Sequence, residues 1–182
     1  PYDLLTFAGM VCKACGLTLT TEVIPNGDYP VQKFTRAPVT GRQLLGWIGE
    51  ICARFVRADA DGNVDFAWYT DSGVTIQAAG DNYYFAGSLS YENYQAAPID
   101  AVQLRLADSD SGALWPEAAE GANSYVISGN PILMAAVTED LLPYLQMIRQ
   151  ELEGVTYTPC KASFPARLDV RAGNTVRVVD KD

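Results

Sequence analysis

The sequence predicts an α+β fold in two lobes, because helical spacing dominates its first part and strand-like alternation its second. Apolar residues recur at helical spacing in segment 2–15 of the first part. They do so again in one segment of the second part, 139–153, which is the inserted helix. Apolar and polar residues alternate in 102–106, which is typical of a half-buried strand. We therefore expect a helix-helix-hairpin lobe over residues 1–98. We expect a small antiparallel sheet or barrel with one inserted helix over residues 99–182.

The first lobe begins with two predicted helices and a hairpin. Gly16 is placed to end the first helix, because glycine is favoured just after a helix. Thr40 and Gln43 have the spacing of a capping box, which predicts the start of the second helix. Asp61-Gly62 predicts a hairpin turn. The two strands of that hairpin are expected at 54–58 and 64–69.

The remaining elements alternate strands with one helix. Residues 70–98 are rich in Gly, Asn, Ser and Tyr and predict short strands and a Tyr-rich connector. The inserted helix is expected over 138–153, with Thr138 as its N-cap and Gly154 after its end. Further strands are expected at 125–128, 155–164 and 175–179.

Three glycines occur within or beside the second predicted helix, at positions 41, 46 and 49. Glycine inside a helix costs conformational entropy, so it needs a structural reason. We expect these three to let another part of the backbone approach closely.

The chain contains no histidine in 182 residues. Histidine is the commonest general base and a common metal ligand, so its absence excludes Ser-His-Asp and Cys-His catalysis and most zinc sites. The net charge of −9 disfavours binding to phosphate backbones and to anionic membranes. No apolar run is long enough for a transmembrane helix. We therefore expect a non-enzymatic protein with no cofactor, no bound metal, no membrane partner and no sequence-specific nucleic-acid partner.

Four cysteines, at positions 12, 15, 52 and 160, show no disulfide framework. Cys12 and Cys15 form a C-x-x-C in the last turn of the first predicted helix. Reactive pairs of this kind lie at helix N-termini, where the dipole lowers the thiol pKa. We favour small apolar core residues in a reducing compartment over metal ligands or a redox dithiol.

Some carboxylates are spaced as candidate sites. Asp59, Asp61 and Asn63 suggest a calcium loop, but the later bidentate Glu is missing, so a polar hairpin turn is favoured. Asp108 and Asp110 lie by a Ser-Gly turn, and Glu117 and Glu120 flank an Ala pair. Nothing in the sequence marks any two of them as a catalytic pair.

Five aromatic residues within twelve positions form the strongest binding-type feature: Tyr83, Tyr84, Phe85, Tyr91 and Tyr94. A tyrosine ring offers an apolar body with a polar tip, which suits both subunit interfaces and sugar stacking. Three interpretations remain open: rings that fill the core, an assembly interface, and a glycan-binding platform.

Segment 39–66 resembles a unit of the tail proteins of long-tailed phages and prophages of Gram-positive bacteria. In that unit a helix of the T-x-R-x-L-L-x-x-I-A kind precedes a D-x-D-G hairpin. Segment 125–133 matches their Y-x-I-x-x-N-P-L-L pattern, and segment 152–160 matches L-x-G-x-x-Y-x-P. Segment 168–180 matches L-D-x-G-D-x-V-x-V-x-D, with Asn174 where the family often has Asp and with two additional residues before Gly173.

The resemblance implies a tail-tip or baseplate hub protein, also called a tail-associated protein. Members of that family typically form a trimeric ring that closes the tail tube. For this chain it implies a structural role, partners among copies of itself and neighbouring tail proteins, and location in the virion tail after assembly in the bacterial cytoplasm. The matched positions are structural, so the resemblance brings no catalytic residues.

Two alternatives come from the residues themselves. One is a carbohydrate-binding or receptor-binding module that uses the cluster between Tyr83 and Tyr94. The other is a small hydrolase that works with carboxylates such as Asp108 and Glu117. The chain begins at Pro1 without a methionine, and 178–182 resembles a strand entering a turn, so we expect a piece of a longer protein.

Overall fold

The computed structural model confirms an α+β protein and groups its contacts into two compact units. Unit 1 comprises Pro1–Ala67 and Pro98–Val155, and unit 2 comprises Trp68–Ala97 and Thr156–Asp182. The structure describes residues 1–34, 38–80, 82–106, 112–117, 122–135, 138–167 and 169–179, without the side chains of residues 138 and 139.

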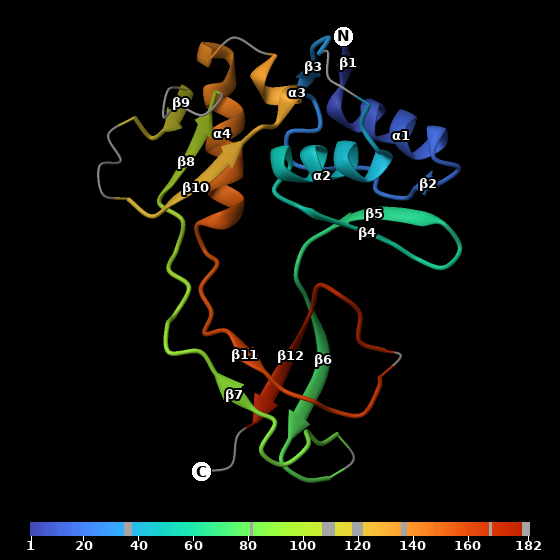
Figure 1. Ribbon diagram of the computed structural model, residues 1–182, viewed down its shortest axis with the longest axis vertical. Helices are drawn as coiled ribbons and strands as arrows, with labels where there is room; N and C mark the ends of the chain where they lie inside the picture. The colour runs from blue at the N-terminus through green and yellow to red at the C-terminus, as the bar shows by residue number, and fades with distance from the viewer. Residues whose placement is uncertain are drawn as a thin grey trace. The chain divides into compact units, whose positions relative to one another are not determined.

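Unit 1 begins with two helices that pack on each other, α1 (Leu4–Ala14) and α2 (Gly41–Ile51) (Figure 1). The Thr40–Gln43 capping box is confirmed: Thr40 Oγ1 accepts from the Gln43 backbone N–H at 3.2 Å, and Gln43 Oε1 accepts from the Thr40 N–H at 2.9 Å. Helix α1 starts two residues later than expected, because the Asp3 carboxylate caps it by accepting from the Thr6 N–H at 2.7 Å.

Two small sheets complete the N-terminal part of unit 1. In the first, β1 (Tyr2–Asp3) pairs antiparallel with β3 (Pro30–Val31). The second has the order β2-β5-β4, with β2 (Thr18–Leu19), β5 (Asn63–Ala67) and β4 (Phe55–Ala58). Strands β4 and β5 form the predicted hairpin, and the positive φ of Gly62 allows its turn.

The C-terminal part of unit 1 is a three-stranded sheet in contact with a helix. Its strand order is β10-β8-β9, with β10 (Ser124–Ser128), β8 (Ala101–Arg105) and β9 (Gly112–Trp115). Helix α4 (Thr138–Leu152) contacts β8 and β9 (Figure 1). Strands β8 and β9 are antiparallel as expected, but β10 runs parallel to β8 because the chain crosses from β9 to the other edge of β8. The strands that the structure describes form open sheets and no closed barrel.

A short helix, α3 (Pro131–Met134), follows β10, where the sequence suggested only the end of a strand. Asn130 is its N-cap: Asn130 Oδ1 accepts from the Ile132 N–H at 3.1 Å. Proline at the first helical position suits this start, because its missing N–H would have no partner inside the helix.

One apolar core joins the two segments of unit 1. Leu4 and Ile48 from the N-terminal segment and Leu104, Ile127 and Ile148 from the C-terminal segment belong to the same buried cluster. The burial of these apolar side chains in one continuous cluster is the main contribution to the stability of unit 1.

Three buried polar side chains also tie the two segments together. Asn26 Nδ2 donates to Ile51 O at 2.8 Å and to Tyr144 O at 3.0 Å. The Tyr29 hydroxyl donates to Ile132 O at 3.0 Å. Asn130 Nδ2 donates to Trp47 O at 3.0 Å. The contact grouping therefore differs from the predicted division into 1–98 and 99–182, because the segment after Pro98 shares its core and its buried hydrogen bonds with the first 67 residues.

Unit 2 is built from two pairs of strands. Strand β6 (Thr70–Gln77) pairs parallel with β12 (Asn174–Val179), and β7 (Ser90–Tyr91) pairs antiparallel with β11 (Cys160–Lys161). The strand expected over 155–164 is therefore only two residues long. The core of unit 2 is small and centres on three buried side chains, Val74, Ile76 and Tyr84.

A half-buried carboxylate, Glu50, lies beside the Asn130 N-cap in unit 1. Asn130 Nδ2 donates to Glu50 Oε2 at 3.0 Å. Burial raises the pKa of Glu50 above its ordinary value of 4.5, and the hydrogen bond from Asn130 opposes that rise. The native state therefore binds this proton more tightly than the unfolded state. As the pH rises above about 4.5, the carboxyl group loses its proton more readily in the unfolded state than in the native state. The contribution of Glu50 to the free energy of unfolding therefore falls over this pH range.

Glu50→Gln is expected to flatten the pH dependence of stability just above pH 4.5. The glutamine keeps an oxygen acceptor for Asn130 and removes the ionisation. Urea unfolding over a series of pH values, with the exposed Glu22→Gln as a charge-matched control, measures this. If Glu50→Gln keeps the wild-type slope, the assignment of that slope to Glu50 is wrong.

Candidate assembly surface

The structure separates the five predicted aromatic residues into one core ring and four surface rings. Tyr84 is 7% exposed and packs with Val74 and Ile76. Tyr83, Phe85, Tyr91 and Tyr94 are 40 to 59% exposed. Core filling therefore explains Tyr84 alone. The split follows from the period of extended backbone, in which the side chains of residues 83 and 85 point away from that of residue 84.

Two antiparallel segments of unit 2 carry the exposed rings. The Phe85 N–H donates to Ser163 O, the Glu92 N–H to Pro159 O and the Ala96 N–H to Tyr157 O, each at 2.8 Å. Between them, Tyr91 pairs with Cys160 in the β7–β11 ladder. The Tyr83 and Phe85 rings meet edge to face, with their centroids 5.9 Å apart.

Tyr157 is a further exposed ring, and it lies outside the predicted aromatic cluster. It lies opposite Ala96 and so joins the same pair of segments, although more than sixty positions separate it from Tyr94 in the chain. No local sequence signal indicates this neighbour. We call the five exposed rings on these segments the aromatic ribbon: Tyr83, Phe85, Tyr91, Tyr94 and Tyr157.

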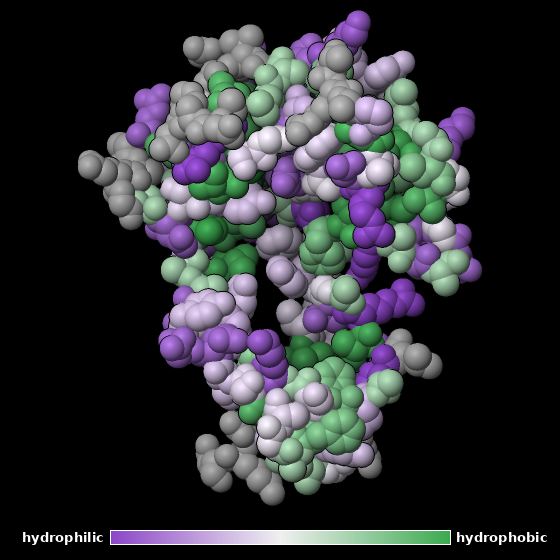
Figure 2. All heavy atoms as spheres, viewed as in Figure 1, coloured by the Kyte–Doolittle hydropathy of each residue, from purple (hydrophilic) through white to green (hydrophobic). Residues whose placement is uncertain are grey.

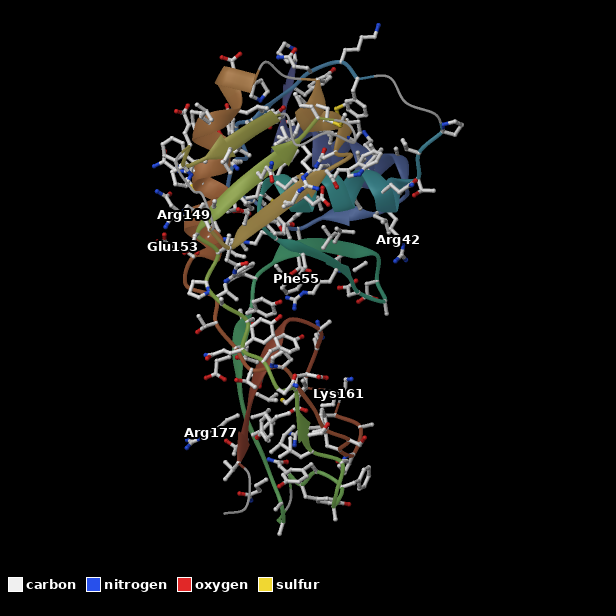
Figure 3. The ribbon with its side chains drawn as sticks, turned by 60° about the vertical axis from the view of Figure 1, so that its left-hand side comes forward. Arg42, Phe55, Arg149, Glu153, Lys161 and Arg177 are labelled. Atoms are coloured by element: carbon white, nitrogen blue, oxygen red, sulfur yellow. The ribbon has the colours of Figure 1, made fainter. Side chains whose placement is uncertain are left out.

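Charge is distributed unevenly between the units. Unit 2 contains five basic residues (Lys161, Arg167, Arg171, Arg177 and Lys181) and six acidic ones (Asp71, Asp81, Glu92, Asp169, Asp180 and Asp182). Its net charge is therefore −1, and unit 1 carries −8 of the total of −9. Arg177 extends away from strand β12 (Figure 3). On the visible face of unit 2, hydrophobic side chains lie at the surface beside hydrophilic ones (Figure 2).

An ion pair links the two segments that carry the ribbon: Lys161 Nζ lies 3.5 Å from Glu92 Oε1. Both side chains are exposed, so water and salt screen this pair and it contributes little to stability. Breaking this ion pair would therefore cost little free energy.

The cysteines divide between core and surface. Cys12 and Cys52 are buried, Cys15 and Cys160 are exposed, and all four are free. Burial raises the pKa of the Cys12 thiol and raises that of Cys52 to about 12, so neither is an activated thiolate. Core packing thus describes Cys12 and Cys52, whereas Cys15 follows helix α1 at its C-cap.

The candidate acidic residues lie only partly within the described part of the chain. The Asp59 carboxylate accepts from the Asp61 and Asn63 N–H groups, each at 2.9 Å, so it forms the predicted polar turn. Glu117 is exposed, and Asp108, Asp110 and Glu120 lie outside the described residues. Across the described ranges, no three His, Cys, Asp or Glu side chains are grouped to hold a metal ion. None of the described helices combines the length and apolarity needed to cross a membrane.

Comparison with known proteins gives one structural likeness. No protein-family model matches the chain, and no curated protein matches it. A crystal structure of the 43 kDa tail protein of prophage MuSo2 from Shewanella oneidensis is similar, with a TM-score of 0.48 and 16% sequence identity. The match covers 99% of this chain and 53% of that one, so this chain spans about half the length of that protein.

Proposed function

We propose that this chain is a structural component of a phage or prophage tail, at the tail tip or baseplate hub. In this proposal it assembles with copies of itself and with neighbouring tail proteins, and it acts without catalysis or a cofactor. The observation that carries the proposal is the order of the sequence motifs between residues 39 and 180, which follows that of tail-associated proteins of Gram-positive phages. The likeness to the Shewanella oneidensis protein is too low in identity and TM-score to add to it.

The motif residues have structural roles in this chain, as the proposal requires. The T-x-R motif begins with the Thr40 cap of α2, and the N-P motif contains the Asn130 cap of α3. In the last motif, Asn174 Oδ1 accepts from the Arg171 N–H at 2.8 Å, and Asn174 Nδ2 donates to Thr70 Oγ1 at 3.0 Å. That motif begins and ends at residues 168 and 180, which lie outside the described residues.

Composition of purified tails tests the proposal. Mass spectrometry of tails from an induced lysate is expected to detect this chain at constant stoichiometry with other tail proteins. Immunogold labelling is expected at one end of the tail, and deletion of the gene should leave particles without complete tails. Intact, infective particles that lack the chain would contradict the proposal.

A second candidate function, glycan binding, is favoured by the exposure of four tyrosines in the aromatic ribbon. A glycan array probed with the chain and with Tyr91→Ala tests it. Saturable binding that Tyr91→Ala abolishes and Tyr2→Ala preserves would favour this function, because Tyr2 is an equally exposed ring in unit 1. The absence of binding to cell-wall and surface glycans would exclude it.

A further inference from the structure

We propose that Asn26 is a deamidation site that the closed core of unit 1 protects, and that its modification prevents unit 1 from closing again. Asn26-Gly27 is the only Asn-Gly dipeptide in the chain. A glycine after asparagine leaves the backbone nitrogen unhindered, so asparagine loses its amide most readily in this dipeptide. The site goes beyond the proposed role in a tail and does not depend on it.

The reaction needs only water as a second reactant. The Gly27 backbone nitrogen gives up its proton to solvent and bonds to the side-chain carbonyl carbon of Asn26. The amide nitrogen of Asn26 takes a proton from solvent and leaves as ammonia. The five-membered succinimide that results takes up one water molecule and opens to aspartate or to isoaspartate, in which the chain continues through the side chain. Position 26 thereby exchanges a neutral amide for a carboxylate.

The native structure holds both reacting groups in other hydrogen bonds. The Gly27 N–H donates to Ile24 O at 3.1 Å. Asn26 Nδ2 donates to Ile51 O at 2.8 Å and to Tyr144 O at 3.0 Å, and the residue is only 8% exposed. Before the reaction, Asn26 must leave these two acceptors, and the Gly27 N–H must leave its own. The closed form of unit 1 therefore suppresses deamidation.

Distant segments of unit 1 must separate before the site can react. Ile51 is the last residue of α2, and Tyr144 lies in α4, 118 positions from Asn26. The Leu5 N–H donates to Gly27 O at 3.1 Å, which ties the same turn to α1. The reaction is thus confined to molecules in which the contacts of this turn with α2 and α4 are broken. Its rate measures the open fraction of unit 1.

The product does not fit the closed core. A carboxylate at position 26 has no hydrogen to donate, and its oxygens would face the carbonyl oxygens of Ile51 and Tyr144. A buried charge without a partner is strongly destabilising. Isoaspartate also lengthens the backbone within the turn that bonds to Leu5. A chain that stays open long enough to react is therefore kept open.

Peptide mass spectrometry of the 182-residue chain during incubation at mildly alkaline pH tests the protection. The variant Tyr94→Gly supplies a matched control in the same molecule, because it places a glycine after the exposed Asn93 of unit 2. In native buffer, Asn26 is expected to lose its amide at least about tenfold more slowly than Asn93, because only the open fraction of unit 1 reacts. In concentrated urea, the two sites are expected to react at similar rates. Similar rates in native buffer, or an unreactive Asn26 in urea, would overturn the inference.

Hydrogen exchange tests the effect of the product. Asn26→Asp is expected to lower the protection of α2 and α4 by at least about tenfold. Asn93→Asp makes the same change of charge at an exposed position of unit 2 and should leave that protection unchanged. Full protection of α2 and α4 in Asn26→Asp would contradict the proposed effect.

Wild-type chains aged in urea and returned to native buffer give a second measurement, which does not require Asn26→Asp to fold. Mass spectrometry separates the chains that kept the Asn26 amide from those that lost it. The first group is expected to regain the protection of α2 and α4, and the second group is not. Equal recovery of the two groups would show that deamidation leaves unit 1 able to close.

Discussion

Replacing Asn130 with alanine is expected to lower the free energy of unfolding of unit 1 by about 3 kcal/mol. The Asn130 side chain is fully buried and makes three hydrogen bonds, to Trp47 O, to Glu50 Oε2 and from the Ile132 N–H. Alanine leaves the Ile132 N–H without its side-chain acceptor and removes the donor to helix α2. A buried polar group that loses its partner costs more than the bond itself contributes to stability.

Hydrogen exchange of unit 1 is the suitable measurement, because a chain with two compact units need not unfold in one transition. Amides of α2 and α4 are expected to lose protection together in Asn130→Ala, since this side chain helps to join the two segments of unit 1. Asn93→Ala, at an exposed position in unit 2, should change protection little. Equal protection in both variants would show that the core alone holds the segments together.

The second large effect is expected at Gly49, where alanine should destabilise unit 1 by about 2 kcal/mol. A Cβ atom at this position would lie 2.7 Å from the backbone oxygen of Arg54, as the chain returns from α2 into β4. The Arg54 N–H donates to Gly49 O at 2.9 Å, so the two backbones are held together and neither moves away cheaply.

Gly46 on the same helix provides the matched control with the opposite sign. A Cβ atom there meets nothing within 4 Å, and the residue is exposed. Gly46→Ala is expected to stabilise α2 by about 1 kcal/mol, because alanine has the higher helix propensity. Urea unfolding of the two variants, followed by hydrogen exchange of α2, compares them. Shifts of the same sign would contradict the close approach at Gly49.

The three glycines in and beside α2 show how far close packing can be predicted from the sequence alone. The expected close approach of another backbone is confirmed at Gly49. At Gly41 a Cβ atom would collide with the Cys15 side chain, so the close neighbour there is a side chain and not the backbone. The expectation is wrong at Gly46, which faces open space. The three positions have the same local pattern. Only the path of the chain after α2 and the position of α1 distinguish them.

The exposed aromatic rings, too, were only partly predictable from the sequence, because segments distant in the chain decide which rings are buried. The alternation of Tyr83, Tyr84 and Phe85 predicts that neighbouring rings face opposite sides, and the structure has one buried and two exposed. Which side is buried depends on Val74 and Ile76 of β6. Tyr157 was beyond prediction, because its place in the ribbon follows from the pairing of segments far apart in the sequence.

Sequence by itself determined the elements whose hydrogen bonds close within a few residues: the Thr40–Gln43 cap, the Asp61-Gly62 turn and the helix at 138–152. Tertiary structure alone decided the boundary between the units, the parallel pairing of β8 with β10, and the exposure of the ribbon. Asn26 illustrates the difference, since its side chain bonds to Tyr144 O, 118 positions away. Local conformational propensities depend on residues within about one turn of the chain. The burial of a side chain depends on the segments that pack against it, and these are often far away in the sequence.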